Sequence, residues 1–182
     1  PFGPNPSKGV VVTGRKDEIA VRPAIAADSN AVCAIDERVL GRDERRDFLR
    51  SAIELGECLV AEIGREIAGF VVVDRSLYDQ RFVALLIVDP AHQRRGVRPA
   101  PMRAGERGFP GEKLFTPNNA SHLPIPGGSV SSAGDGENLP MQALCEGLGY
   151  VRSGWIENLD EGDPEIVYFK RTPIDSGAGR DR

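Results

Sequence analysis

Residues that build metal centres and disulfide frameworks are scarce in this sequence. Its three cysteines, Cys33, Cys58 and Cys145, show no CxxC spacing, and its two histidines are His92 and His122. An odd number of cysteines without paired spacing predicts neither a disulfide scaffold nor a zinc site. Two histidines also exclude a histidine-built metal cluster. We therefore expect no metal, and we expect Cys33 and Cys58 to be buried, reduced thiols.

Long apolar runs and an excess of basic charge are also missing. No apolar stretch approaches the roughly 20 residues that cross a membrane as a helix. The first residues lack the charged and apolar regions of a signal peptide. The formal net charge of −4 argues against a nucleic-acid surface, which normally has a basic balance. These absences predict a soluble, cytoplasmic protein that binds neither nucleic acid nor a membrane.

Enough apolar side chains are present for one ordinary domain. The chain has 182 residues, of which 40% are hydrophobic, and this length suits a single hydrophobic core. We predict one domain over residues 18–171, between a flexible arm at 1–17 and a flexible tail at 172–182. Residues 117–137 are rich in Gly, Ser and Pro, which predicts a disordered insertion within the domain.

Apolar periodicity and turn residues predict a series of strands and helices. Strands are expected at 19–22, 58–63, 67–73, 82–88, 113–116, 150–156 and 166–170. Helices are expected at 31–40, 43–55, 98–108 and 139–148. Asp28 or Ser29 is expected to cap the first helix, and polar loops are expected around Tyr78 and Asp79 and at 157–165. This order predicts an α/β fold with a mixed sheet and helices on both faces.

One stretch carries the most specific chemistry. An apolar strand, Val83 to Val88, ends at Asp89-Pro90, where proline cannot donate to a sheet ladder. The stretch continues as Gln93-Arg94-Arg95-Gly96-Val97. A glycine and two arginines before a helix can bind a phosphate or pyrophosphate on exposed backbone N–H groups. A solvated turn is the alternative, but the strand, the Asp-Pro break and the following helix favour an anion site.

This stretch resembles the signature of the GNAT superfamily of acetyl-coenzyme A-dependent N-acetyltransferases. The family pattern, Gln/Arg-x-x-Gly-x-Gly/Ala after the fourth strand, is matched by Gln93 to Val97 up to its last position. A second family pattern is an asparagine before a helix that ends in Leu-Tyr-Glu-x-x-Gly-aromatic. It is matched by Asn138, Leu144, Glu146, Gly149 and Tyr150. The two motifs occur in the family's order, and the resemblance covers residues 19–171.

The resemblance implies a mixed, mostly antiparallel sheet of the acyl-CoA acyltransferase fold, with acetyl-CoA as co-substrate. Val88 would supply backbone hydrogen bonds to the pantetheine arm. Asn138 would contact the coenzyme from the other side of a sheet splayed between the central strand and 113–116. The pyrophosphate would be wrapped by Gln93, Arg94, Arg95, Gly96 and Val97. The implied activity is acetyl transfer to a primary amine of a small molecule or peptide, and a homodimer is left open.

Three positions depart from the family pattern. Arg98 stands in place of the second glycine or alanine, and Pro99 removes an N–H group that could face a phosphate. A lost hydrogen bond to a charged group costs about 1.5–3 kcal/mol, so coenzyme binding would weaken, although Arg98 could itself bind phosphate. Cys145 stands where the family often has a tyrosine that protonates the leaving thiolate. Cys145 is therefore either that acid or a buried, inert thiol.

No general base stands out in the sequence. Asp79, Glu157 and Glu165 could each face the acetyl group, although their positions favour solvated loop or hairpin carboxylates. Negative charge concentrates at 157–165, where it would attract a cationic amine, although a solvated turn explains it as well. The leading hypothesis is an N-acetyltransferase. The alternative is a non-catalytic coenzyme-binding or scaffold protein, which Pro99 and the insertion motivate.

Overall fold

The computed structural model describes most of the predicted domain. It describes residues 18–93, 95–118, 138–160 and 163–174. The predicted arm, Arg94 and the predicted insertion from residue 119 onward lie outside these ranges. Within them, the strands are β1 (Ile19–Pro23), β2 (Cys58–Ile63), β3 (Glu66–Leu77), β4 (Gln80–Val88), β5 (Lys113–Pro117), β6 (Val151–Asp160) and β7 (Asp163–Arg171). The helices are α1 (Ser29–Leu40), α2 (Arg46–Glu54), α3 (Pro99–Gly108) and α4 (Leu139–Gly147), with 3-10 turns η1 (Ala26–Asp28) and η2 (Pro90–His92).

Ordered structure extends into the predicted insertion and into the predicted tail. Pro117, which the sequence assigns to the insertion, ends β5. Asn118 follows it and exchanges two hydrogen bonds with Ile166, at 2.8 and 2.9 Å. Thr172, which the sequence assigns to the tail, is buried, and its N–H donates to the carbonyl of Glu112 at 2.9 Å. Long-range hydrogen bonds hold these residues, and such bonds leave no local trace in the sequence.

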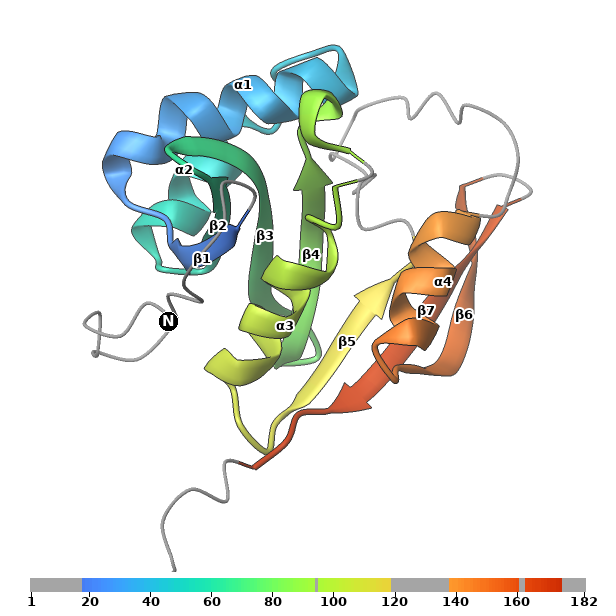
Figure 1. Ribbon diagram of the computed structural model, residues 1–182. Helices are drawn as coiled ribbons and strands as arrows, with labels where there is room; N and C mark the ends of the chain where they lie inside the picture. Colours follow the sequence, from blue (N-terminus) through green and yellow to red (C-terminus); the bar gives the residue numbers. More distant parts are fainter. Residues whose placement is uncertain (1–17, 94, 119–137, 161–162, 175–182) are drawn as a thin grey trace, which may run out of the picture.

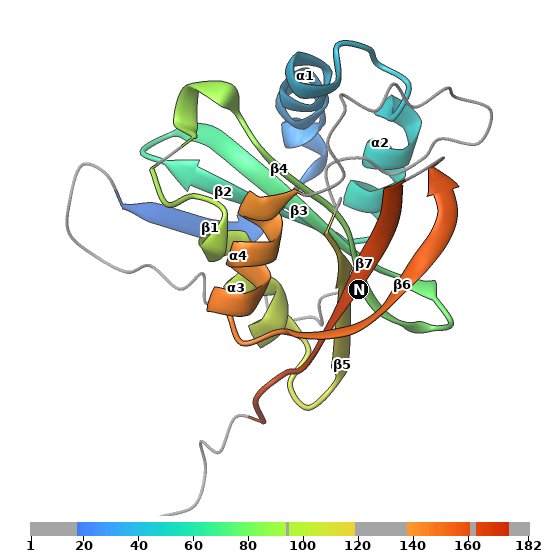
Figure 2. The ribbon, with the colours of Figure 1, turned by 90° about the vertical axis from the view of Figure 1, so that its right-hand side faces the viewer.

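The strands form one sheet in the order β1-β2-β3-β4-β5-β7-β6. Neighbouring strands are antiparallel except β4 and β5, which are parallel. Helices α1 and α2 cover one face, and α3 and α4 cover the other (Figures 1 and 2). This arrangement confirms the predicted α/β class, a mixed and mostly antiparallel sheet with helices on both faces. Among the described residues, no helix is long and apolar enough to span a membrane.

Alternating side chains of the central strands divide the core into two layers. On β3, Phe70 points into the layer under α1 and α2, whereas Val71 points into the layer under α3 and α4. Because both faces are covered, the central strands carry few polar side chains, which explains the apolar run at 82–88. Cys33 and Cys58 lie in the first layer as free, buried thiols, as predicted.

Two hairpins are longer than the sequence predicts. Strand β3 extends to Leu77 and β4 begins at Gln80, so the expected polar loop shrinks to Tyr78 and Asp79. Both turn residues have positive φ, 48° and 58°, as a two-residue type I′ turn requires. Most of the expected acidic turn at 157–165 likewise belongs to β6 and β7. The apolar pattern misses these strand ends, because a backbone ladder continues through polar residues.

The sheet separates between β4 and β5. Two residue pairs join these strands, at Arg81 and Phe82 of β4. A bulge follows at Ala84, where β4 has one residue more than the matching stretch of β3. A bulge bends its strand, so the carboxyl half of β4 turns away from β5. The two strands therefore form a wedge that widens toward their carboxyl ends (Figure 1).

An ion-pair cluster, rather than the expected side-chain cap, holds the start of α1. Asp28 occupies the N-cap position, but its carboxylate makes no capping bond to α1. It accepts instead from Arg22, at 2.6 and 3.0 Å, and from the N–H of Ile25 at 2.8 Å. Arg22 also donates to Glu62 on β2 at 2.6 Å. The Arg22 guanidinium holds the pKa of Asp28 below its ordinary value.

Replacing Asp28 by asparagine should change the acid stability of the protein. Because folding lowers the pKa of Asp28, its ion pair stabilises the native state above the unfolded pKa, and this contribution is lost as pH falls through the folded pKa. At pH 7, D28N should lose about 1 kcal/mol of unfolding free energy, since Arg22 is one-third exposed. The difference from the natural chain should shrink below about pH 4. Urea unfolding across this pH range measures it, and a difference independent of pH contradicts the assignment.

Candidate functional site

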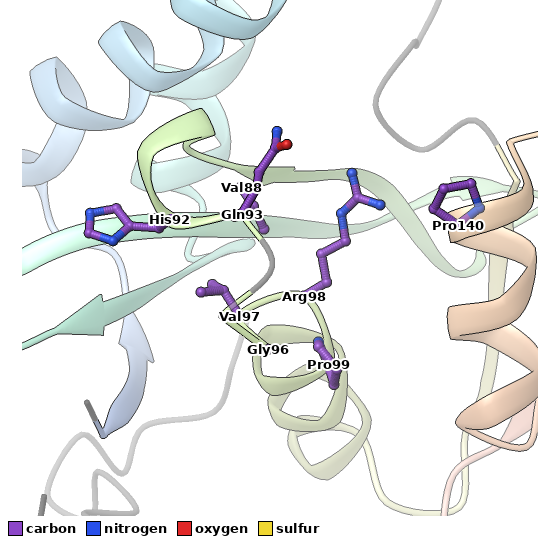
Figure 3. Close-up of a pocket in the computed structure, with 8 residues that line it drawn as sticks. All are labelled: Val88, His92, Gln93, Gly96, Val97, Arg98, Pro99 and Pro140. Carbon is purple, nitrogen blue, oxygen red and sulfur yellow. The ribbon is translucent and has the colours of Figure 1, made fainter.

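A cavity of about 350 Å³ lies at the carboxyl end of β4, where the wedge opens. Its lining comes from the end of β4, the following loop and the starts of α3 and α4. The lining residues are Val88, His92, Gln93, Gly96, Val97, Arg98, Pro99 and Pro140 (Figure 3). The fold therefore brings together most of the residues that the sequence singles out for an anion site. We call this space the coenzyme cavity.

Asp89 follows the last residue of β4 and turns the chain toward the loop. Its N–H donates to the carbonyl of Ala68 on β3 at 2.9 Å, and its carboxylate accepts the N–H of Ala91, also at 2.9 Å. Pro90 opens the η2 turn, a position where a missing N–H removes no helical hydrogen bond. The Asp-Pro break is thus a capped turn, and it leads to Gln93 in an extended conformation.

Gly96 and Val97 shape the loop before α3. Gly96 has a φ of 72°, a left-handed conformation that L side chains rarely adopt. Val97 is 2% exposed and packs with Ala68 and Val88, which anchors the loop to the sheet. The N–H groups of Gly96, Val97 and Arg98 donate to no backbone carbonyl of the described residues. Successive uncommitted N–H groups before a helix form a concave site for a phosphate.

Prolines at the start of α3 decide which groups can contact an anion. Pro99 and Pro101 lie in the first turn and have no N–H, while Ala100 donates to a carbonyl of the preceding loop at 3.1 Å. The loop must therefore supply the backbone donors. Arg98 extends from the start of α3 into the space between β4 and Pro140 of α4 (Figure 3). Its guanidinium supplies charged N–H donors near the first turn of α3, where the prolines have no backbone N–H.

Asn138 caps α4. Its Oδ1 accepts the N–H of Met141 at 3.2 Å, which confirms the predicted cap. Pro140, in the first turn of the same helix, faces the loop across the coenzyme cavity (Figure 3). Asn138 thus lies two residues from the lining, and its contact with a coenzyme stays a prediction.

Three predicted site residues lie apart from this cavity or outside the described chain. Cys145 has no exposed surface and belongs to the core layer under α3 and α4. Burial raises the pKa of its thiol to about 12. Arg95 is exposed and does not belong to the lining, and Arg94 lies outside the described residues. The catalytic role of Cys145 and the phosphate contacts of the two arginines stay predictions.

The three carboxylates considered as general bases lie in different places. Asp79 is in the turn before β4, nine residues from Val88, which is about 30 Å along a strand. Glu157 on β6 is exposed and accepts from a neighbouring indole N–H at 3.3 Å. Glu165 on β7 is buried, next to the residue that pairs with Asn118 at the end of β5. Glu165 therefore lies near the carboxyl end of β5, on the side away from β4, whereas Asp79 is at the far end of β4 from the coenzyme cavity.

Gly69 on β3 is a site-shaping residue that sequence reasoning missed. A Cβ on Gly69 would lie 2.6 Å from the carbonyl oxygen of Ile87 and 3.2 Å from the Cα of Val88. A residue without a side chain is therefore needed for β4 to approach β3 this closely. The available signal was an isolated glycine within an apolar strand, which often marks a close backbone approach.

Solved structures of acetyltransferases resemble this chain over most of its length. A GNAT-family acetyltransferase from Bacillus cereus ATCC 10987 is 30% identical, with a TM-score of 0.72 over 85% of this chain and 98% of that chain. The ribosomal-protein-S18-alanine N-acetyltransferase from Escherichia coli is 18% identical, with a TM-score of 0.61 over 91% and 99%. The yncA protein from Salmonella typhimurium, solved with its cofactor acetyl-CoA, is 16% identical, with a TM-score of 0.62 over 90% and 98%.

Family membership follows from the first of these similarities. No family model matches the chain, and no curated protein matches it significantly. The structures from Escherichia coli and Salmonella typhimurium show a shared fold alone, because their identities are low. The Bacillus cereus protein shares 30% of its residues with this chain over almost its entire length. The chain therefore belongs to the GNAT family of acetyltransferases.

Proposed function

We propose that the chain transfers an acetyl group from acetyl-CoA to a primary amine of a small molecule or peptide. The wedge between β4 and β5, which ends in the coenzyme cavity, carries this proposal. Beyond Phe82, the edge of β4 that faces the wedge is not paired with β5, so its backbone groups can bond to the amides of an extended pantetheine arm. Val88, the last residue of β4, is the proposed final backbone partner before the pyrophosphate.

The loop after β4 is the proposed pyrophosphate site. The N–H groups of Gly96, Val97 and Arg98, which donate to no backbone carbonyl of the described residues, are the proposed donors to the pyrophosphate, and the helix dipole favours negative charge at the start of α3. The Arg98 guanidinium adds a charge-assisted contact from within the lining. Gln93 and the arginines at 94 and 95 complete the proposed loop. Asn138 is proposed to contact the coenzyme from α4, with the side-chain nitrogen that its capping bond does not use.

The reaction joins an amine nitrogen to the acetyl carbon and breaks the carbon–sulfur bond of the thioester. The amine attacks in its neutral form, so a base accepts a proton from it, and the coenzyme A thiolate takes up a proton as it leaves. Positioning of the two reactants and polarisation of the carbonyl supply most of the catalysis. Glu165, which is buried on β7 near the end of β5, and Glu157 on the same hairpin are the proposed bases.

The last hairpin supports a cationic acceptor. The sequence at 157–165 contains the five carboxylates Glu157, Asp160, Glu161, Asp163 and Glu165. The GNAT resemblance implies that this hairpin lies near the acceptor site, where negative charge would attract a cationic amine. A cytoplasmic location and a homodimer stay predictions.

Two measurements test the proposal separately. Calorimetric titration with acetyl-CoA should show binding, and free pantetheine, which lacks the pyrophosphate, should bind at least about tenfold more weakly. Release of the coenzyme A thiol in the presence of a panel of primary amines should require both acetyl-CoA and an amine. An absence of acetyl-CoA binding at millimolar ligand contradicts the proposal.

A second candidate function is coenzyme binding without catalysis, as in a scaffold protein. Two observations favour it: Cys145 is fully buried at the position of the family's acid, and the first turn of α3 has two prolines. Binding of acetyl-CoA without thiol release across the whole amine panel would assign this function.

Replacing Cys145 by alanine tests its catalytic role. Since the thiol is buried and its pKa is raised to about 12, we expect C145A to keep kcat within about threefold and to lose about 1 kcal/mol of stability. A general acid would instead contribute about a hundredfold or more to kcat. A loss of that size, with unchanged affinity for acetyl-CoA, would assign Cys145 as the acid. Steady-state kinetics and urea unfolding of the same preparation separate the two results.

A further inference from the structure

We infer that Arg38 on α1 is a positioning residue for the loop between β4 and α3, which we call the coenzyme loop. It acts through Asp89. The inference rests on the proposed function, because it concerns the same cavity. The Nη2 of Arg38 donates to Oδ2 of Asp89 at 2.5 Å. The two residues are 51 positions apart in the sequence. Arg38 lies on α1, and Asp89 directly follows β4. This ion pair therefore ties a helix to the turn that begins the loop.

Asp89 is placed to transmit this restraint. Its carboxylate uses Oδ2 for Arg38 and Oδ1 for the N–H of Ala91, so one side chain bridges α1 and the η2 turn. Its backbone N–H donates to Ala68 on β3, and its carbonyl accepts the N–H of His92 at 2.8 Å. Burial acts to raise the pKa of Asp89, but the Ala91 N–H and the Arg38 guanidinium hold it below its ordinary value. The bridge is therefore ionised at neutral pH.

The loop is short enough for this restraint to matter. Gln93 follows η2 directly, and Val97 is fixed in the apolar cluster with Ala68. The segment between these two anchors presents the proposed phosphate donors. If Arg38 is removed, the nearly buried carboxylate of Asp89 loses its cationic partner and is driven to turn toward water. That movement releases the Ala91 N–H and loosens the start of the loop, while Val97 still holds its end.

Truncation of Arg38 should have little effect on core packing. Its side chain is 52% exposed, whereas that of Asp89 is 10% exposed. Both line a second cavity of about 550 Å³ between α1 and the β2–β3 hairpin. An alanine at position 38 therefore enlarges a space that is already open to solvent and leaves no void in an apolar layer. The expected effect is on the loop, which separates a positioning role from a purely structural one.

The test compares R38A and R38K with R50A as the matched control. Arg50 on α2 is 48% exposed and has a 4.0 Å ion pair with Asp47, so its removal deletes a similar surface arginine away from the loop. Calorimetry gives the affinity for acetyl-CoA, and thiol release gives KM and kcat. Amide hydrogen exchange at Ala91 and His92 reports on the turn without any ligand. All measurements are made well below the unfolding temperature of each variant.

We expect R38A to bind acetyl-CoA about tenfold more weakly and to raise KM by a similar factor, with kcat nearly unchanged. R38K should recover part of the affinity, because an ammonium can still pair with Asp89. Exchange at the Ala91 amide should rise about tenfold in R38A and stay unchanged in R50A. Unchanged exchange in R38A overturns the inference. Faster exchange in a protein whose natural form does not bind acetyl-CoA supports the restraint and instead contradicts the proposed function.

Discussion

Replacement of Gly69 by alanine should destabilise the protein and weaken coenzyme binding together. The added Cβ would lie 2.6 Å from the carbonyl oxygen of Ile87, and this obstacle is backbone, which cannot rotate away as a side chain could. Strand β4 must therefore shift at Ile87 and Val88, beside the coenzyme cavity. Overpacking of this kind costs about 1–3 kcal/mol, and we expect a value near the upper end. Affinity for acetyl-CoA should fall at least tenfold, because Val88 and the loop move with the strand.

The matched control for this change is Gly147→Ala on α4. A Cβ at Gly147 meets nothing within 4 Å beyond its chain neighbours and the backbone of its own helix, so G147A should be neutral or more stable by about 0.5–1 kcal/mol. Chemical denaturation gives the unfolding free energies, and calorimetry gives the affinity for acetyl-CoA. If G69A and G147A change the unfolding free energy by the same amount, the close approach of β3 and β4 is not the reason for a glycine at position 69.

Removal of Arg45 should produce the largest loss of stability. Arg45 precedes α2 and makes a two-point contact with Asp36 on α1, at 3.1 and 2.7 Å. Both side chains are almost completely buried, with 3% and 2% exposure. Breaking a buried pair by removing one partner costs about 3–5 kcal/mol, because the remaining charge has lost its compensation. We expect a loss in this range for R45A by urea unfolding at pH 7.

The pH dependence of R45A and a double variant distinguish this cause from a packing defect. Burial raises the pKa of Asp36 in the folded protein, and the charge and hydrogen bond of Arg45 act to lower it. In R45A these two opposing interactions are lost. A raised folded pKa means that stability is present below the unfolded pKa and is lost as pH rises. R45A should therefore be more stable near pH 4 than near pH 7. The double variant D36L/R45M should regain most of the loss, and a double variant as unstable as R45A would point to packing instead.

The strands, the helices and the coenzyme loop could be predicted from local patterns in the sequence. Apolar alternation and punctuation by glycine and proline identified the strands and helices, including the cap at Asn138. The Gln93 to Val97 motif placed an anion site at the carboxyl end of β4, and the coenzyme cavity lies there. Predicted loops at Tyr78–Asp79 and 157–165 were too long, because a hairpin ladder is set by backbone pairing and not by side-chain polarity.

Other properties of the site depend on residues that are distant in the sequence. The wedge requires a bulge at Ala84 just after two pairs with β5, a register that no single segment encodes. The restraint of Arg38 on Asp89 spans 51 positions. The burial of Cys145, which bears on its predicted catalytic role, depends on how α4 packs against the sheet. Side chains with such distant contacts have no local pattern in the sequence, because they meet their partners only in the folded chain.

The sequence by itself determined the order of elements, the family resemblance and the position of the phosphate loop. These properties follow from residue types at short spacings, where sterics and backbone donors act locally. Only the tertiary structure decided how far β4 and β5 separate, which residues hold the coenzyme loop and that the Cys145 thiol is buried. These properties follow from contacts between distant segments, and the free energy of such contacts is set by burial and geometry that exist only in the folded state.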